Sequence, residues 1–185
     1  ANGGFSICWY EDRDADQMRN VYVQHVNADG SIAFAPNGIQ PTVSATTQHF
    51  YPVTAYDSVN NKTYVVWSET DGSQNLRGLR VQAIDQQGQK LFGDEGLNLI
   101  PLGGLSPMPI KADIVNGDLI ALFSSSLNGS AVDSELRAVR INTAGDFVWE
   151  SDFVSLKNIA SASVHEEVAD FQSNQALIIW EDDRS

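Results

Sequence analysis

Long hydrophobic runs, paired cysteines and basic side chains are all scarce in this 185-residue sequence. No stretch approaches the roughly 20 apolar residues that a membrane-spanning helix needs, so we expect no membrane span. The single cysteine, Cys8, excludes an internal disulfide, and its place in the apolar run 5–9 predicts a buried thiol. Only 11 basic residues stand against 24 acidic ones, and the net charge of −13 disfavours nucleic-acid binding through a basic surface.

The 3.6-residue periodicity of amphipathic helices is also missing, and the sequence instead shows a repeat with a long period. The sequence is 42% hydrophobic, which is typical of a globular chain, and its length suits one domain. Short apolar runs recur at separations of 58, 56 and 57 residues, and each ends in an aromatic residue: Trp9, Trp67, Phe123 and Trp180. Such a period has to be recognised before any other interpretation of the fold.

Two further landmarks share this period. A turn glycine is followed four positions later by an aromatic residue in three units: Gly30 and Phe34, Gly88 and Phe92, Gly145 and Trp149. Alanines in the preceding segment are 57 residues apart: Ala55, Ala112 and Ala169. Three landmarks at one spacing predict a chain built from copies of a single unit.

Each unit is predicted to contain four antiparallel strands. The aromatic-ended strand is apolar on both alternating faces, which indicates a strand covered on both sides. A β-branched strand follows and ends at the glycine turn, a hairpin signal, and a fourth strand is expected directly after the turn, through 31–35, 89–93 and 146–150. Four short strands in about 57 residues are typical of a propeller blade.

We therefore predict an all-β fold, a β-propeller segment of four-stranded antiparallel blades in one domain. The expected division is a partial blade at 1–47, blades at 48–104 and 105–161, and a partial blade at 162–185. These blades are too few to close a ring. We therefore expect the remaining blades of a longer propeller, or other chains, to complete it. The start at "ANGG" rather than Met indicates a mature secreted product or an excerpt.

The repeat resembles the blades of secreted bacterial β-propeller repeat proteins, many of unassigned function. Their W-x-D-x-R corner is matched by "WYEDR" at 9–13 and "WEDDR" at 180–184, and their IYVQRVN-x-x-G turn by "VYVQHVNADG" at 21–30 and "LRVQAIDQQG" at 79–88. The likeness covers essentially the whole chain and implies a secreted or cell-surface location, or the periplasm. The third unit departs from it, because "FSSSLNG" at 123–129 replaces the corner.

The recurring pairs Asp12–Arg13 and Asp183–Arg184 are interpreted as structural fasteners at blade corners. An Arg side chain can hold a carboxylate and backbone carbonyls together in a fork. A feature repeated in several blades is more often structural than catalytic.

An alternating acidic loop is the one candidate for a cofactor site. Asp12, Asp14, Asp16 and Asn20 fall at positions 1, 3, 5 and 9 of "DRDADQMRN", a spacing of oxygen ligands that can wrap Ca²⁺. It resembles the calcium loops of integrin-type propellers, except that Gln17 replaces Gly and Asn20 replaces Asp. Two interpretations stay open, a calcium site and a solvated acidic loop. The replacements at Gln17 and Asn20 favour the solvated loop.

No catalytic residue is assigned from the sequence. Acidic candidates on the strands expected nearest the channel are Asp57, Asp113, Asp170 and Glu166. Glu166 and Glu167 are adjacent, so on a strand they point to opposite faces and form a poor acid–base pair.

The leading hypothesis is a non-catalytic extracellular propeller that serves as a scaffold or a recognition surface for protein or glycan. One alternative is a lectin binding carbohydrate between blades, although Trp9, Trp67 and Trp180 end apolar runs and are expected in the blade cores. The other alternative is part of a propeller hydrolase with its site in the central channel.

Overall fold

The computed structural model describes residues 4–126, 135–157, 163–171 and 175–182, and within 163–171 it describes the backbone and the Glu167 side chain. All regular elements in these ranges are β-strands, as the alternating apolar pattern predicts. The strands form four antiparallel sheets, and each sheet uses strands that are consecutive in sequence.

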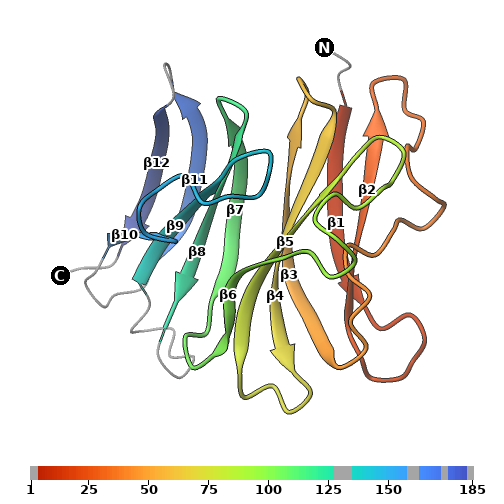
Figure 1. Cartoon of the computed structure of the whole chain (residues 1–185), viewed down its shortest axis with the longest axis horizontal. Coiled ribbons are helices and arrows are strands. Elements are labelled where there is room, and N and C mark those ends of the chain that lie inside the picture. Colours follow the sequence, from red (N-terminus) through yellow and green to blue (C-terminus); the bar gives the residue numbers. More distant parts are fainter. Residues whose placement is uncertain (1–3, 127–134, 158–162, 172–174, 183–185) are drawn as a thin grey trace.

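Two four-stranded sheets form the middle of the molecule, and a two-stranded sheet lies at each end (Figure 1). The first pair is β1 (Gly4–Glu11) and β2 (Asn20–Asn27). The second sheet contains β3 (Thr47–Asp57), β4 (Lys62–Asp71), β5 (Arg77–Ile84) and β6 (Leu97–Gly103). The third contains β7 (Met108–Val115), β8 (Asp118–Ser125), β9 (Glu135–Ile141) and β10 (Val154–Lys157). The last pair is β11 (Ser163–Phe171) and β12 (Gln175–Asp182).

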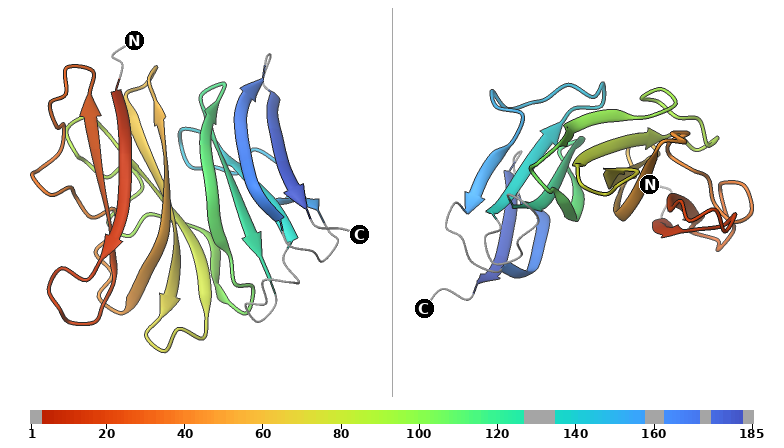
Figure 2. Two further views of the ribbon diagram at one scale, coloured as in Figure 1. Left: turned by 180° about the vertical axis from the view of Figure 1, so that it is seen from behind. Right: turned by 90° about the horizontal axis from the view of Figure 1, so that it is seen from below.

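The four sheets follow one another along an open arc (Figure 2). Strands β3, β7 and β11, the first of their sheets, lie next to one another along the inner side of the arc. β1 packs beside β3 in the same row. The order within the two complete sheets therefore runs outward, from β3 to β6 and from β7 to β10.

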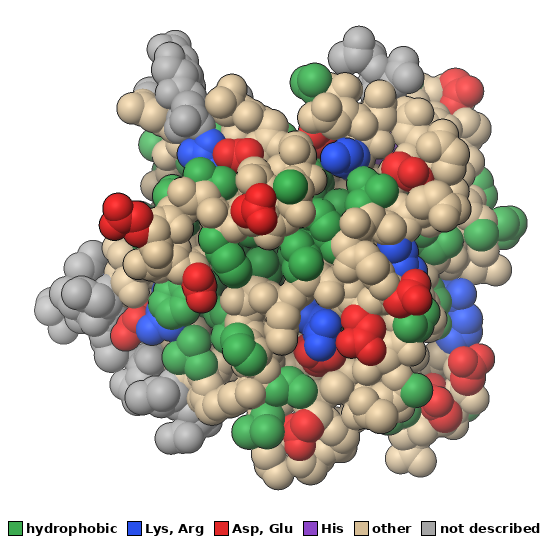
Figure 3. Space-filling view, viewed as in Figure 1, with side chains coloured by type: hydrophobic (Ala, Val, Ile, Leu, Met, Phe, Trp, Pro, Cys, Tyr) green, Lys and Arg blue, Asp and Glu red, His purple; other side chains and the backbone are tan. Residues whose placement is uncertain are grey.

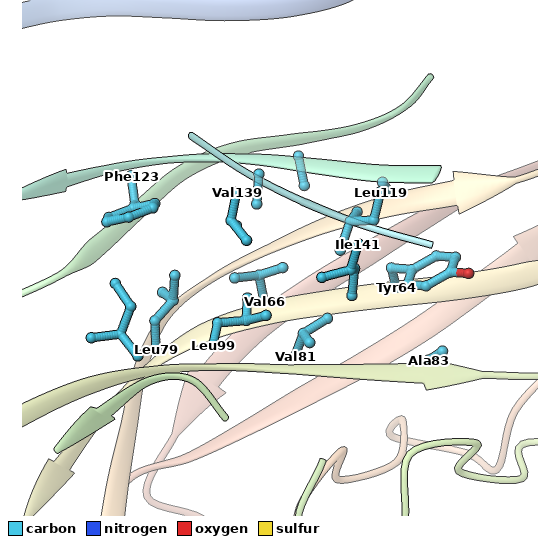
Figure 4. Packing of buried hydrophobic residues seen from close by; sticks show 14 residues of the cluster. Tyr64, Val66, Leu79, Val81, Ala83, Leu99, Leu119, Phe123, Val139 and Ile141 are labelled. Carbon is cyan, nitrogen blue, oxygen red and sulfur yellow. The ribbon is translucent and has the colours of Figure 1, made fainter. Parts of the chain in front are cut away.

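Hydrophobic side chains fill the space between the two four-stranded sheets (Figure 4). Tyr64 and Val66 of β4 face Leu119 and Phe123 of β8, and all four are buried. On the other side of β4, Trp67 packs toward the β1–β2 sheet with no exposed surface. The apolar residues on the two faces of β4 thus belong to two successive hydrophobic cores, one on each side of the sheet.

The fourth strand does not begin directly after the glycine turn, and that prediction was wrong. Residues 31–35, 89–93 and 146–150 make only isolated bridges, and β6 and β10 come later in the chain. The reason is a competing side chain. The Gln82 amide accepts from Phe92 N at 2.9 Å and donates to Gly93 O at 2.6 Å, so it satisfies backbone groups that a strand would use.

The same arrangement occurs in the first unit. Gln24 accepts from Phe34 N at 2.9 Å and donates to Ala35 O at 3.0 Å. The strand predicted at 31–35 is accordingly reduced to one bridge, Val26 with Ile32, and a second bridge, Val23 with Ile39, lies where Val81 pairs with Leu97 of β6 in the next unit.

On the face shown in Figure 3, charged side chains are spread out, and hydrophobic side chains show in the centre between the two four-stranded sheets. The described part of the chain has no helix that is long and apolar enough to cross a membrane.

Candidate functional site

The three innermost strands share a β-bulge at one place in the repeat. The register shifts between Phe50 and Val53 in β3, between Pro109 and Lys111 in β7, and between Val164 and Glu167 in β11. Each bulge lies opposite or beside the aromatic residue that ends the apolar run of the next strand: Trp67, Phe123 or Trp180. Bulges redirect side chains and are frequent beside active sites, so this row is the candidate functional site.

The bulge in β3 contains Tyr51 and Pro52. Tyr51 has a φ of 51°, a left-handed conformation that costs a bulky L-residue about 1 to 3 kcal/mol. Pro52 has no N–H to offer the ladder, which suits a position where pairing is interrupted. The result is a tyrosine ring that is 41% exposed on an inner strand.

Tyr51 belongs to an aromatic cluster with Tyr10 and Phe50. The Tyr10 ring centroid lies 5.6 Å from that of Phe50 and 5.8 Å from that of Tyr51, both edge-on, and Phe50 and Tyr51 are 5.9 Å apart. Tyr10 is 40% exposed, and the Arg19 guanidinium lies 5.8 Å from the Phe50 centroid. Exposed tyrosines present an apolar ring face and a hydroxyl together, a surface suited to a ligand with both kinds of group.

A buried polar network lies directly beside this cluster. His49 Nε2 is 3.0 Å from Thr47 Oγ1, which donates to Glu69 Oε1 at 2.9 Å. Arg80 Nε donates to Glu69 Oε2 at 2.6 Å, and His49 Nδ1 is 3.2 Å from Asn20 Oδ1. His49 and Glu69 are almost fully buried. The network therefore fixes the strand segment that leads into the bulge.

Burial lowers the pKa of His49 to about 4, against the raising effect of the Glu69 carboxylate. The imidazole is accordingly neutral at pH 7, and it serves as a fixed hydrogen-bonding group. The carboxylate of Glu69 is matched by Arg80, so the buried charge is compensated.

The other two bulges carry different residues. Ile110 is the inserted residue in β7, and the β11 bulge contains His165 and Glu166, whose side chains lie outside the described residues. Beside them, Lys111 Nζ forms an ion pair with Glu167 Oε2 at 2.9 Å, which joins β7 to β11. Both side chains of this pair are well exposed, so the pair contributes about 1 kcal/mol or less to the free energy of folding.

The carboxylates predicted to lie near the channel do not form a pair among the described residues. Asp57 is buried and accepts from Val59 N at 3.0 Å and from Asn60 N and Nδ2 at 3.1 and 2.7 Å, so it organises the β3–β4 turn. Asp113 is half-buried, and its Oδ1 accepts from Ile114 N at 2.8 Å. The side chains of Asp170 and Glu166 lie outside the described residues.

The residues of the proposed calcium loop are used in two ways. Asp12 accepts from Asp16 N and Gln17 N at 3.1 and 3.0 Å, and Asp16 accepts from Met18 N at 2.8 Å. Asn20 turns toward His49. Within the described ranges, no group of three or more His, Cys, Asp or Glu side chains is arranged to hold a metal. Calcium binding through Asp12, Asp14, Asp16 and Asn20 stays a prediction.

The corner arginine holds a carboxylate and a backbone carbonyl together, as the fastener interpretation describes. Its carboxylate is Glu11 rather than Asp12, and its carbonyl is that of Asn37, at 2.9 Å. The guanidinium also lies 3.7 Å from the Tyr22 ring centroid. Asp183 and Arg184 of the last copy lie outside the described residues.

The later sheets keep an Arg–carboxylate pair but change which positions supply it. Glu69 occupies the place of Glu11 and Arg80 the place of Tyr22. In the third unit Ser125 replaces the carboxylate, and Arg137 pairs with Glu135 at 2.8 Å and covers the Phe153 ring at 4.5 Å. The sequence did not reveal these exchanges, because the pairing partners are not at fixed spacings.

No protein-family model matches the sequence, and a search of curated proteins finds no match. Among solved structures, the chain is similar to an endo-arabinase from Bacteroides thetaiotaomicron VPI-5482, with a TM-score of 0.56 and 11% identity. The similarity covers 96% of this chain and 66% of that one. A GH43 endo-arabinanase from Bacillus licheniformis gives a TM-score of 0.47 at 12% identity, over 98% of this chain and 70% of that one.

The arc of antiparallel four-stranded sheets and the first of these similarities define the class of fold: this chain is a β-propeller segment. It spans 66% of the length of the first similar structure. This similarity concerns the fold alone. The resemblance of the repeat motifs to those of secreted bacterial repeat propellers stays a prediction.

Proposed function

We propose that this chain is part of a propeller that acts on glycans, and that sugar binds at the aromatic cluster of Tyr10, Phe50 and Tyr51. The observation that carries the proposal is Tyr51, an exposed aromatic side chain in a strained bulge on an inner strand. Strain of this kind persists only where the surroundings impose it, and it is concentrated at functional sites. Aromatic faces suit sugars, because the C–H groups of a sugar ring are apolar while its hydroxyls need polar partners.

The similarity to an endo-arabinase supports the hydrolase alternative over the purely non-catalytic reading. Glycoside hydrolysis generally needs two carboxyl groups about 5 to 9.5 Å apart across the bond to be cut. Among the described inner-strand carboxylates, Asp57 is engaged in a turn, Asp113 accepts from the backbone N–H of Ile114, and Glu167 is paired with Lys111. We therefore assign binding to this segment and place hydrolysis in the complete propeller. Cell-wall polysaccharides such as arabinan lie outside cells, which fits the secreted location that the repeat resemblance implies.

Affinity electrophoresis in gels containing arabinan, xylan or starch tests the binding step. We expect retardation of the wild type in at least one of these gels and a loss of about tenfold in affinity for Tyr51→Ala, equivalent to about 1.4 kcal/mol. Val59→Ala is the matched control, because Val59 is 84% exposed in the turn at the other end of β3. Equal retardation of Tyr51→Ala and wild type, or no retardation in any gel, contradicts the proposal.

Release of reducing ends from the same polysaccharides separates the two candidate activities. Binding without release identifies a recognition surface, whereas release by the complete propeller identifies a hydrolase.

A further inference from the structure

Arg19 is an exposed basic side chain at the edge of the aromatic cluster of Tyr10, Phe50 and Tyr51. Its guanidinium lies 5.8 Å from the centroid of the Phe50 ring, within the range of a cation–π contact. Among the residues that the structure describes, this guanidinium has no hydrogen-bond partner and no ion-pair partner. Its fork of N–H donors is therefore open to an acceptor from outside the chain.

The backbone of Arg19 is held in place beside the aromatic cluster. His49 N donates to Arg19 O at 2.8 Å, and the side-chain oxygen of the next residue, Asn20, lies 3.2 Å from His49 Nδ1. His49 is fully buried in β3, the strand that also carries Phe50 and Tyr51. The fold thus keeps the guanidinium within one side-chain length of the rings.

Acidic residues precede Arg19 in the same loop, and their carboxylates do not pair with it. Asp12 and Asp16 accept hydrogen bonds from backbone N–H groups of residues 16–18. Asp14 is exposed and forms no ion pair within the described ranges. The positive charge beside the rings is therefore not neutralised by direct contact.

The cluster itself lies at the junction of the first two sheets. Cys8 of β1 points toward β3, since its Sγ donates to Pro52 O at 3.3 Å. Tyr10 follows two positions later and points the same way along the strand, where its ring meets those of Phe50 and Tyr51. Rings from two sheets and a cation from the loop between β1 and β2 thus converge on one surface.

We propose that this surface binds an acidic sugar, a uronate unit whose carboxylate pairs with Arg19. The inference rests on the glycan binding proposed above and names the class of sugar. A uronate ring offers an apolar C–H face to the tyrosines and a planar carboxylate whose two oxygens match the guanidinium fork. A neutral sugar would meet the same rings but would leave Arg19 without a partner of opposite charge.

The net charge of −13 repels anions at a distance, so direct contact with Arg19 has to supply the preference for an acidic sugar. Polymers that differ only in charge test this contact. Affinity electrophoresis at one ionic strength compares gels containing polygalacturonate or polymannuronate with gels containing their methyl esters, which keep the sugar rings and lose the carboxylate charges.

We expect the wild-type chain to bind at least one of the two uronates about three- to tenfold more tightly than its ester. Arg19→Gln should remove this preference and leave binding to the ester unchanged, because the rings stay in place. The variant should also melt like the wild type, since the contact of Arg19 with His49 uses the backbone carbonyl.

Two further variants serve as controls. Lys62→Gln removes one positive charge at the far end of β3, opposite Asp57, and should keep the preference of the wild type. Tyr51→Ala should weaken binding to uronate and ester alike, because both forms of the sugar use the rings.

The outcomes separate the acidic-sugar inference from glycan binding itself. Wild-type binding by Tyr51→Ala in every gel contradicts the glycan site, and the uronate inference fails with it. Equal or tighter binding to the esters, with Tyr51→Ala weaker in both kinds of gel, overturns the uronate inference alone. A preference that persists in Arg19→Gln, or that is lost equally in Lys62→Gln, shows that contact with Arg19 does not select the sugar and also overturns it.

Discussion

The indole of Trp67 lies against Gly96, so closely that a Cβ built on Gly96 would stand 3.0 Å from Cη2 of the ring. The same relationship joins Trp9 to Gly38, 58 residues earlier, where the distance would be 2.6 Å. In the third unit Phe123 replaces the tryptophan and packs edge-on against Phe153, with 6.0 Å between ring centroids. Two medium-sized rings there replace one large ring and a glycine.

Gly96→Ala should lower the free energy of unfolding by about 2 to 4 kcal/mol, because the new methyl group meets Val81 O and Trp67 at a backbone φ of +75°. Gly93→Ala is the matched control. It has almost the same φ, +73°, with nothing within 4 Å of the built Cβ, so it should cost only the conformational strain of about 1 kcal/mol. Urea denaturation measures both, and equal losses would show that packing against Trp67 does not matter.

The contribution of the repeated Arg–carboxylate pair to the stability of the fold depends on how deeply the pair is buried. Glu69→Ala should destabilise the fold by about 3 kcal/mol or more, because it removes the buried carboxylate that pairs with Arg80 Nε and accepts from Thr47 Oγ1. Glu11→Ala removes the corresponding carboxylate from Arg13 at a site where both side chains are more than one third exposed, and should destabilise the fold far less than Glu69→Ala. Chemical denaturation compares the two, and similar losses would contradict the assignment.

Stability should fall as the pH drops from about 6.5 to about 4, with His49 as one identifiable cause. The unfolded imidazole takes up a proton near 6.5, whereas the folded one resists protonation until about 4, so the unfolded state binds more protons in this window. The shift corresponds to a loss on the order of 3 kcal/mol.

His49→Gln should flatten this dependence, since it removes the titrating group while Glu69 and Arg80 stay in place. Urea unfolding at several pH values gives the slope. A variant with an unchanged slope would show that His49 does not contribute.

Calcium binding by the Asp12–Asn20 loop predicts that millimolar Ca²⁺ raises the melting temperature. Asp14→Ala should abolish this rise and leave the melt without calcium unchanged, because the backbone N–H groups of residues 16–18 donate to the carboxylates of Asp12 and Asp16. Asp12→Ala should lower the melting temperature even without the ion. A melt that is insensitive to calcium, with Mg²⁺ as the reference cation, would eliminate the site.

The strands could be predicted from the sequence because their signals are local. Gly30, Gly88 and Gly145 all have positive φ at the turns where the pattern placed them. The fourth strand could not be predicted, because Gln82 and Gln24 compete for the backbone about ten residues further along the chain. No local pattern indicates whether a side chain or another strand will form hydrogen bonds with those backbone N–H and C=O groups.

The candidate site was missed for a related reason. The exposure of Tyr51 depends on the register of β3 against β4, and the register is a property of two strands. Pro52 within a strand was the one signal that could have indicated an irregularity. The pairing of His49 with Glu69 and Arg80 likewise brings together residues that are far apart in the sequence.

Because the bulge recurs in three strands, the positions at which the repeat is constrained can be distinguished from the positions at which it can vary. The aromatic-ended strand opposite each bulge is held by the cores on both sides, whereas the inserted residue belongs to no ladder pair. The inserted residues differ between the three strands: Tyr51 and Pro52 in β3, Ile110 in β7, and His165 and Glu166 in β11. One duplicated unit can therefore diversify at its bulge one blade at a time, because a substitution of the inserted residue removes no ladder pair.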